Sequence, residues 1–298
     1  MKRPALTLKA LGEDEIVRRL TRQLPLSGRT LVGAGDDCAV LGNGAGHQLF
    51  KTDCVTEHIH FLPETPPQKI GWKALCRCIS DIAAMGGLPT EAVITITAPK
   101  STPWVRLSGI YTGLRRASQR YGVGLVGGET SSLPEGAPLF ISVAMLGSVE
   151  PRRLVLRSGG QPGDAVMVTG VLGGSIHGWH LNFLPRLHEA RWLTQHFKPS
   201  AMMDLSDGPA QDLPRLATAS QCGFDLYPTL LPRRRGATTE QALTDGEDYE
   251  LLFTLPGKKR PALESVWKRQ FPKLKLTMIG ELNDGAAEEM SGWDHFAS

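Results

Sequence analysis

Strand-like and helix-like segments alternate along the whole 298-residue chain, and this alternation constrains the fold more than any other feature. In the first half, apolar residues recur at helical spacing over 67–85, and the pair Gly86-Gly87 marks the end of that helix. The run AVITITA at 92–98 is typical of a strand, and a second helix is predicted over 103–120. Such alternation predicts a layered α/β or α+β fold. Other segments of this half predict a helix at 12–24, strands at 38–41, 48–52 and 139–147, and a strand that leads to Gly127-Gly128.

The second half repeats the alternation after a turn-rich segment, RSGGQPGD at 157–164. The strand-like run AVMVTG follows directly. The chain length lies between that of one large domain and that of two ordinary ones. We therefore predict two domains, at 1–150 and 151–298. Further segments predict helices after Gly174, after Asp207 and near 258–270, and strands at 249–255 and 276–279.

Composition and charge exclude several classes of function. The net charge is only +3 and the basic residues are dispersed, with Arg233-Arg234-Arg235 as the longest basic run. We therefore expect no nucleic acid and no membrane among the partners. No stretch approaches eighteen uninterrupted apolar residues, and the five cysteines form no CxxC pair. We expect a cytoplasmic protein.

Carboxylates stand beside glycine, serine or threonine at the ends of several predicted elements. A fold has no structural reason to collect so many acids beside tight turns. Hard oxygen ligands of this kind are those that Mg²⁺ prefers in proteins. The sequence therefore predicts a magnesium site. The residues concerned are Asp36, Asp37, Asp53, Asp81, Glu129, Asp204 and Asp207.

Asp81 carries most of this argument, because it lies on the apolar face of its predicted helix. It is also near the end of that helix, where the macrodipole disfavours a negative charge. A buried acid there needs a cation, which is either a metal ion or a basic side chain. Asp207 has an alternative role as a helix N-cap, because Gly208-Pro209 follows it. The chain contains no GxxxxGK[ST] sequence, so ATP would bind without a Walker loop.

Eight motifs together carry a resemblance to a known family. In chain order they resemble thiamine-monophosphate kinase, a member of the superfamily that also contains aminoimidazole ribonucleotide synthetase and selenophosphate synthetase. The resemblance covers nearly the whole chain. The motifs are GAGDDCAVL, KTDCVTEHIHF, KALCRCISDIAAMGGLP, GLVGGETSSLP, LVLRSGGQPGDAVMVTG, AMMDLSDGPAQDL, LTDGEDYELLFTLP and the C-terminal GWDHFAS.

The resemblance implies a two-domain fold like that of aminoimidazole ribonucleotide synthetase, in which the N-terminal sheets of two subunits pair in a homodimer. It also implies transfer of the γ-phosphoryl group of ATP to thiamine monophosphate. Asp81 and Asp207 would be catalytic. The implied magnesium ligands are Asp37, Thr52, Asp53, Asp81, Glu129, Asp204 and Asp207. The implied nucleotide contacts are Gly128, Glu129, Arg157 and Ser206, and the implied thiamine contacts are His60, Glu247 and Trp293.

This chain departs from the family pattern at several positions. Lys51 replaces a serine or threonine, so either one magnesium site is lost or the ammonium takes the place of that ion. Glu129 replaces an aspartate, and Pro209 replaces a leucine. The chain is also shorter between 173 and 204 and between 232 and 246. Two alternatives stay open: a superfamily kinase or synthetase acting on another phosphorylated small molecule, and a weakly active thiamine-phosphate binding protein.

Overall fold

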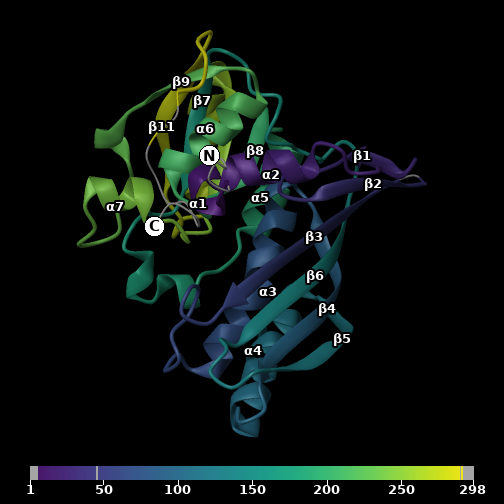
Figure 1. Cartoon of the computed structure of the whole chain (residues 1–298). Helices are drawn as coiled ribbons and strands as arrows, with labels where there is room; N and C mark the ends of the chain where they lie inside the picture. Colours follow the sequence, from purple (N-terminus) through teal and green to yellow (C-terminus); the bar gives the residue numbers. More distant parts are fainter. Residues whose placement is uncertain (1–5, 45, 289, 291–298) are drawn as a thin grey trace, which may run out of the picture.

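Two β-sheets form the framework of the protein in a computed structural model, which describes residues 6–44, 46–288 and 290 (Figure 1). The first sheet uses only residues between 30 and 149, and the second only residues between 164 and 283. No helix within the described residues is long and apolar enough to cross a membrane.

The first sheet has six strands in the order β1-β2-β3-β6-β4-β5. The β4–β5 pair is parallel and all other neighbours are antiparallel. The strands are β1 (Thr30–Val32), β2 (Ala39–Asn43), β3 (Gly46–Thr56), β4 (Leu88–Pro99), β5 (Gly124–Leu133) and β6 (Phe140–Val149).

Helices α3 (Pro67–Ala84) and α4 (Trp104–Tyr121) cover one face of this sheet (Figure 1). Alternation along the strands places Leu49, Val55 and Ile94 on the covered face, where they are buried. Phe50 and Val93 point to the opposite face and are exposed. The first sheet therefore has a helix-covered face and an open face.

Close contact between α3 and α4 depends on glycine. A Cβ atom at Gly71 would lie 1.9 Å from the carbonyl oxygen of Ile110. A Cβ atom at Gly113 would lie 1.9 Å from the carbonyl oxygen of Gln68. The two helices can thus approach only where both backbones lack side chains.

We expect Gly71→Ala to reduce the free energy of unfolding by about 1–3 kcal/mol, because overpacking forces these helices apart. Chemical denaturation measures the change. Gly28→Ala is the matched control, since nothing lies within 4 Å of a Cβ atom there. Equal stability of the two variants would show that the helix crossing tolerates a methyl group.

The second sheet has five antiparallel strands in the order β8-β10-β7-β11-β9. Its strands are β7 (Asp164–Thr169), β8 (Ala201–Asp204), β9 (Gly223–Leu226), β10 (Leu251–Pro256) and β11 (Leu276–Asn283). Its helices are α5 (Leu187–His196), α6 (Pro209–Ala219), α7 (Thr239–Thr244) and α8 (Arg260–Gln270). Short 3-10 turns lie at Ser175–His177, Trp179–Leu181, Pro228–Leu230 and Gly257–Lys259.

Helices cover both faces of the second sheet. Strand β7 is buried along its whole length, which is why its central residues 165–168 are apolar without alternation. Val166 and Val168 pack in the core on the α6 side, whereas Ala165 and Met167 pack with α5 and α8. Ala83 and Ala84 at the end of α3 pack in the core on the α5 and α8 side of the second sheet. Helix α3 therefore contacts both sheets.

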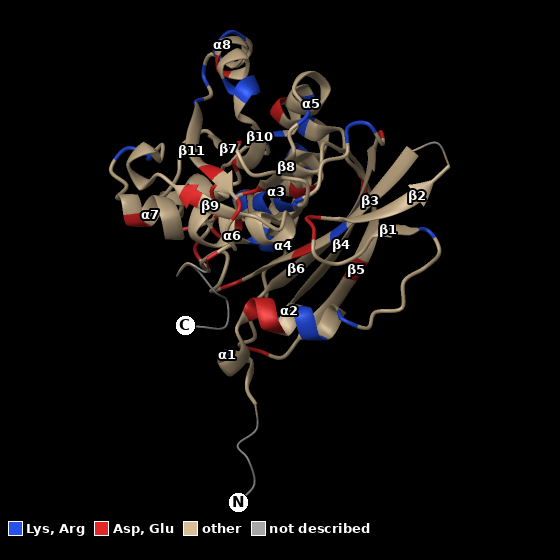
Figure 2. Cartoon of the chain, turned by 90° about the horizontal axis from the view of Figure 1, so that it is seen from above, with Lys and Arg blue, Asp and Glu red and all other residues tan. Residues whose placement is uncertain are grey.

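The N-terminal segment forms α1 (Leu8–Leu11) and α2 (Glu13–Thr21). Figure 2 shows acidic residues at the start of α2 and basic residues at its end, an arrangement that complements the helix dipole. Asp14 of α2 forms a 3.1 Å ion pair with Arg215 of α6. This contact ties the N-terminal segment to the second half of the chain.

The sequence-based assignments are confirmed for the long elements and are wrong in detail elsewhere. Helices α3, α4, α6 and α8 lie where expected. Strand β5 continues through Gly127-Gly128 instead of ending there. The region after Gly174 forms 3-10 turns before α5. Strands β1, β8 and β9 and helix α7 have no counterpart among the predictions, because each is short.

Candidate active site

Three carboxylates from separate segments meet near the C-terminal end of α3. Asp37 precedes β2, Asp81 lies in the last turns of α3, and Asp204 ends β8. One oxygen from each lies within 4.8 Å of the others, and all three residues are buried. The structure therefore brings together three of the seven predicted magnesium ligands in a cluster that we call the carboxylate triad.

Each member of the triad has a different protein partner. Arg157 donates to Asp37 Oδ1 over 2.5 Å and 3.1 Å. Lys51 donates to Asp81 Oδ1 over 2.8 Å. Ser80 donates to Asp204 Oδ2 over 2.5 Å.

One fully buried oxygen of the triad has no partner among the described residues. Asp37 Oδ2 is buried and makes no hydrogen bond with the described residues. Leaving a buried carboxylate oxygen unpaired is costly, so this atom favours a cation at the triad.

The pKa values of the triad also indicate that it is short of positive charge. Burial raises the pKa of Asp81 well above its usual range, and the charges of Asp204 and Asp53 add to the rise despite Lys51. Burial and the charge of Asp37 raise the pKa of Asp204 to about 7. Mg²⁺ prefers carboxylate oxygens, so these residues fit that ion.

Two further predicted ligands lie outside the triad and are paired with arginine. Asp53 of β3 accepts a 2.7 Å hydrogen bond from Arg77 of α3. Asp207 is bonded to Arg215. Asp207 is not a helix cap, because α6 begins after Gly208. The backbone N–H groups of Asp207 and Gly208 donate instead to Asp212 Oδ2, each over 3.0 Å.

The remaining two predicted ligands lie on the open face of the first sheet. Thr52 is on the opposite side of β3 from Asp53, and its hydroxyl is 3.4 Å from that of Ser142. Glu129 is exposed on the edge strand β5 and pairs in register with Thr95. Neither side chain therefore reaches the triad of its own chain.

The predicted nucleotide contacts lie at the triad, on strand β5 and between β8 and α6. Arg157 contacts the triad through its ion pair with Asp37. Gly128 precedes Glu129 on β5, and a Cβ atom there would lie 1.9 Å from the Ile94 carbonyl oxygen, so only glycine fits. Ser206 lies between β8 and α6, and its carbonyl oxygen accepts a 2.6 Å hydrogen bond from the backbone N–H of Glu247.

Two predicted thiamine contacts, His60 and Glu247, are joined by a buried lysine. Lys73 of α3 is fully buried and forms a 2.6 Å ion pair with Glu247 and a 2.7 Å hydrogen bond to the His60 carbonyl oxygen. Tyr249 donates to Glu247 over 3.3 Å. Trp293 lies outside the described residues.

The charge states of these two residues differ. Burial, together with the charges of Arg77 and Lys73, lowers the pKa of His60 to about 3, so the imidazole is neutral near pH 7. Burial alone would raise the pKa of Glu247, but Lys73 and Arg77 hold it below its ordinary value. Glu247 is therefore a carboxylate.

One face of α3 connects the two clusters. Lys73, Arg77 and Asp81 are spaced by four residues and so lie along one side of the helix. Arg77 lies within 2.7 Å of Asp53 and 4.0 Å of Glu247. The sequence analysis did not select Lys73 or Arg77. Their four-residue spacing ahead of Asp81, on an otherwise apolar face, was the signal that could have identified them.

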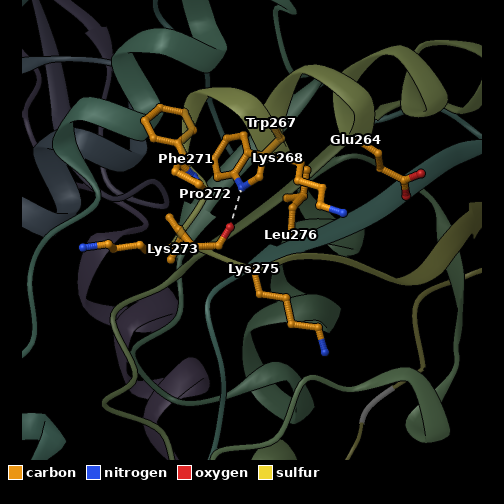
Figure 3. Close-up of a pocket in the computed structure, with 9 residues that line it drawn as sticks. Glu264, Trp267, Lys268, Phe271, Pro272, Lys273, Lys275 and Leu276 are labelled. Carbon is orange, nitrogen blue, oxygen red and sulfur yellow. Dashed lines mark hydrogen bonds between the residues drawn. The ribbon is translucent and has the colours of Figure 1, made fainter.

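A separate cavity of about 490 Å³ lies between α8 and the start of β11 (Figure 3). The Trp267 indole donates to the Leu274 carbonyl oxygen over 2.9 Å at its edge. In Figure 3 the ammonium groups of Lys268, Lys273 and Lys275 point in different directions. These lysines therefore do not converge on one anion, and no residue of the triad lines the cavity.

Comparison with known proteins first defines the class. Residues 35–149 match the family described as AIR synthase related protein, N-terminal domain. A structure of AaThiL complexed with AMPPCP and TMP has a TM-score of 0.84, with 30% identity and coverage of 98% of this chain and 100% of that one. The fold is therefore that of the AIR-synthase-related enzymes.

Sequence relatives then define the family. The thiamine-monophosphate kinase of Rhodopirellula baltica is 37% identical over 268 residues, which cover 84% of this chain and 83% of the relative. That of Aquifex aeolicus is 31% identical and covers 98% of this chain and 100% of its own. The chain belongs to the thiamine-monophosphate kinase family, and the resemblance seen in its motifs is confirmed.

Proposed function

We propose that this enzyme transfers the γ-phosphoryl group of ATP to thiamine monophosphate, forming thiamine diphosphate and ADP. One observation carries the proposal. Helix α3 contacts both the carboxylate triad, which is suited to a metal ion, and the His60–Glu247 pair. Membership of the family supports the same reaction.

Asp37, Asp81 and Asp204 would hold Mg²⁺. When bound, Mg²⁺ neutralises charge on the phosphates and favours in-line transfer. Thr52, Asp53, Glu129 and Asp207 are proposed as further ligands, and Asp81 and Asp207 as the residues on which turnover depends most. Arg157 adds a positive charge beside the triad.

The reaction needs no general base. The acceptor is a phosphate whose second pKa is about 6, so it is largely ionised at neutral pH. The main barrier is the repulsion between two polyanions, and fixed positive charges reduce that repulsion.

On the proposed thiamine side, Glu247 is the carboxylate that could face a cationic ring, and Lys73 and Arg77 lie beside it. Glu247 stays ionised beside Lys73, and neutral His60 adds no positive charge. We propose that Glu247 faces the thiazolium cation and that Trp293 stacks on an aromatic ring of the substrate, as aromatic side chains do with cations.

We propose that residues 1–150 bind ATP and magnesium and form the dimer, and that residues 151–298 complete the nucleotide and substrate sites. Gly128, Glu129, Arg157 and Ser206 are the proposed nucleotide contacts. The proposal includes a cytoplasmic location, where ATP is available. The five cysteines are free thiols, as is usual in a reducing compartment.

The proposed homodimer uses the open face of the first sheet, which also carries Thr52 and Glu129. Phe50 is 47% exposed there, beside Leu146 of β6. We expect Phe50→Glu to convert a dimer into a monomer, because a buried charge at an apolar interface is costly. Size-exclusion chromatography with light scattering measures the mass. Trp104→Glu is the control, since Trp104 is 78% exposed on α4. A monomeric parent protein would overturn the dimer.

The acceptor is tested by comparing thiamine monophosphate with thiamine and with a nucleoside monophosphate, at equal ATP and Mg²⁺. Of the three acceptors, we expect only thiamine monophosphate to give product. Equal rates with the nucleoside monophosphate would show that the site recognises only the phosphate, and they would replace this function with that of a different superfamily kinase.

A further inference from the structure

Lys51 places an ammonium group at the carboxylate triad. Its neighbours Leu49 and Asp53 show that alternate residues of β3 face α3, so the side chain of Lys51 points to the same side. Its ammonium lies 2.8 Å from Oδ1 of Asp81, the member of the triad on α3. Lys51 therefore contacts the triad, although it stands 30 positions away from Asp81 in the sequence.

Two features separate this ammonium from an ordinary buried counter-ion. Its side chain keeps 23% of its exposure, whereas that of Asp81 keeps 9%. Within the described residues it donates one hydrogen bond, and an ammonium has three N–H donors. Two donors thus remain for an anion at the accessible side of the triad.

The charge of Lys51 also competes with metal ions. A cation bound at Asp81 would lie a few ångströms from a fixed positive charge, and such repulsion is strong where water is scarce. Asp37 Oδ2, by contrast, has no partner among the described residues. Arg157 pairs only with Asp37 Oδ1, so Asp37 Oδ2 stays open to a divalent ion, whereas Lys51 already occupies Asp81 Oδ1.

We propose that Lys51 is a resident cation of the active site, which occupies the position of one divalent ion at Asp81 and donates its free N–H groups to a phosphate oxygen. The phosphate contact rests on the proposed function, whereas the displacement of a divalent ion does not. The consequence is that removing the charge of Lys51 opens one more divalent site per chain.

The test counts bound Mn²⁺ by electron paramagnetic resonance, with AMPPCP present, in the full-length protein. We expect Lys51→Ser and Lys51→Gln each to bind one Mn²⁺ more per chain than the parent, and Lys51→Arg to keep the parent number. Lys100→Ser is the matched control, because Lys100 is exposed after the end of β4. Circular dichroism confirms folding. If only one of the two uncharged variants folds, its Mn²⁺ number alone decides whether the proposal holds.

An unchanged Mn²⁺ number in the folded uncharged variants would overturn the proposal and leave Lys51 as a structural ion pair. The result also separates this inference from the proposed function. An added Mn²⁺ in Lys51→Ser would support the inference even if the parent protein made no thiamine diphosphate. Product formation with an unchanged Mn²⁺ number would support the function and reject the role of Lys51.

Discussion

Asp81→Asn is expected to lower kcat by about 10²–10³-fold, the scale on which one electrostatic stabilising group usually acts. Asp81 contributes an oxygen to the triad and is the partner of Lys51. The amide keeps the shape of the carboxylate but loses its charge. A steady-state assay with ATP, Mg²⁺ and thiamine monophosphate measures the loss.

Stability distinguishes this loss from misfolding. Burial and the charges of Asp204 and Asp53 raise the pKa of Asp81 well above its usual range, so its ionised form is disfavoured in the fold. Asp81→Asn relieves the repulsion with Asp204 and Asp53 but leaves Lys51 without its partner, so thermal melting of the variant is measured beside kcat. Asp284→Asn, at an exposed position, is the control for the substitution itself. Near-normal kcat in Asp81→Asn would remove Asp81 from the site.

Arg186→Met is expected to reduce the free energy of unfolding by about 3–5 kcal/mol, because it leaves a buried carboxylate without its cation. Arg186 donates to Glu250 over 2.6 Å, and Glu250 is 1% exposed. Among the described residues, only the 2.7 Å hydrogen bond from Thr169 would remain for that side chain. Chemical denaturation followed by tryptophan fluorescence measures the change.

The matched control is Arg260→Met, which removes the same kind of ion pair at the surface. Arg260 and Glu264 are 3.3 Å apart and their side chains are each 39% exposed. Such pairs contribute less than about 1 kcal/mol. Equal effects of the two substitutions would show that burial does not determine the cost, and that Glu250 finds another partner.

The sequence predicted the parts of the fold that depend on long local patterns. Helix α3 was identifiable from its apolar spacing, and Asp81 from its position on the apolar face of that helix. The need of Asp81 for a cation was also predictable, although the sequence could not choose between a metal ion and a basic residue. The structure identifies Lys51 as a partner.

Other features depend on contacts between distant segments. The pairing of β3 with α3 places Asp53 beside Arg77, and no local pattern gives that register. The position of Thr52 is different, because period-two alternation alone places it across the strand from Asp53. Strand β5 continues through Gly127-Gly128, and residue 128 is glycine because the Ile94 carbonyl on the neighbouring strand leaves no room for a Cβ atom.

The most direct test of the account is thiamine diphosphate formation by the purified protein, measured by chromatography with ATP, Mg²⁺ and thiamine monophosphate. We predict product that disappears when either ATP or Mg²⁺ is omitted. An absence of product from folded protein that binds ATP and Mg²⁺ would contradict the proposed reaction.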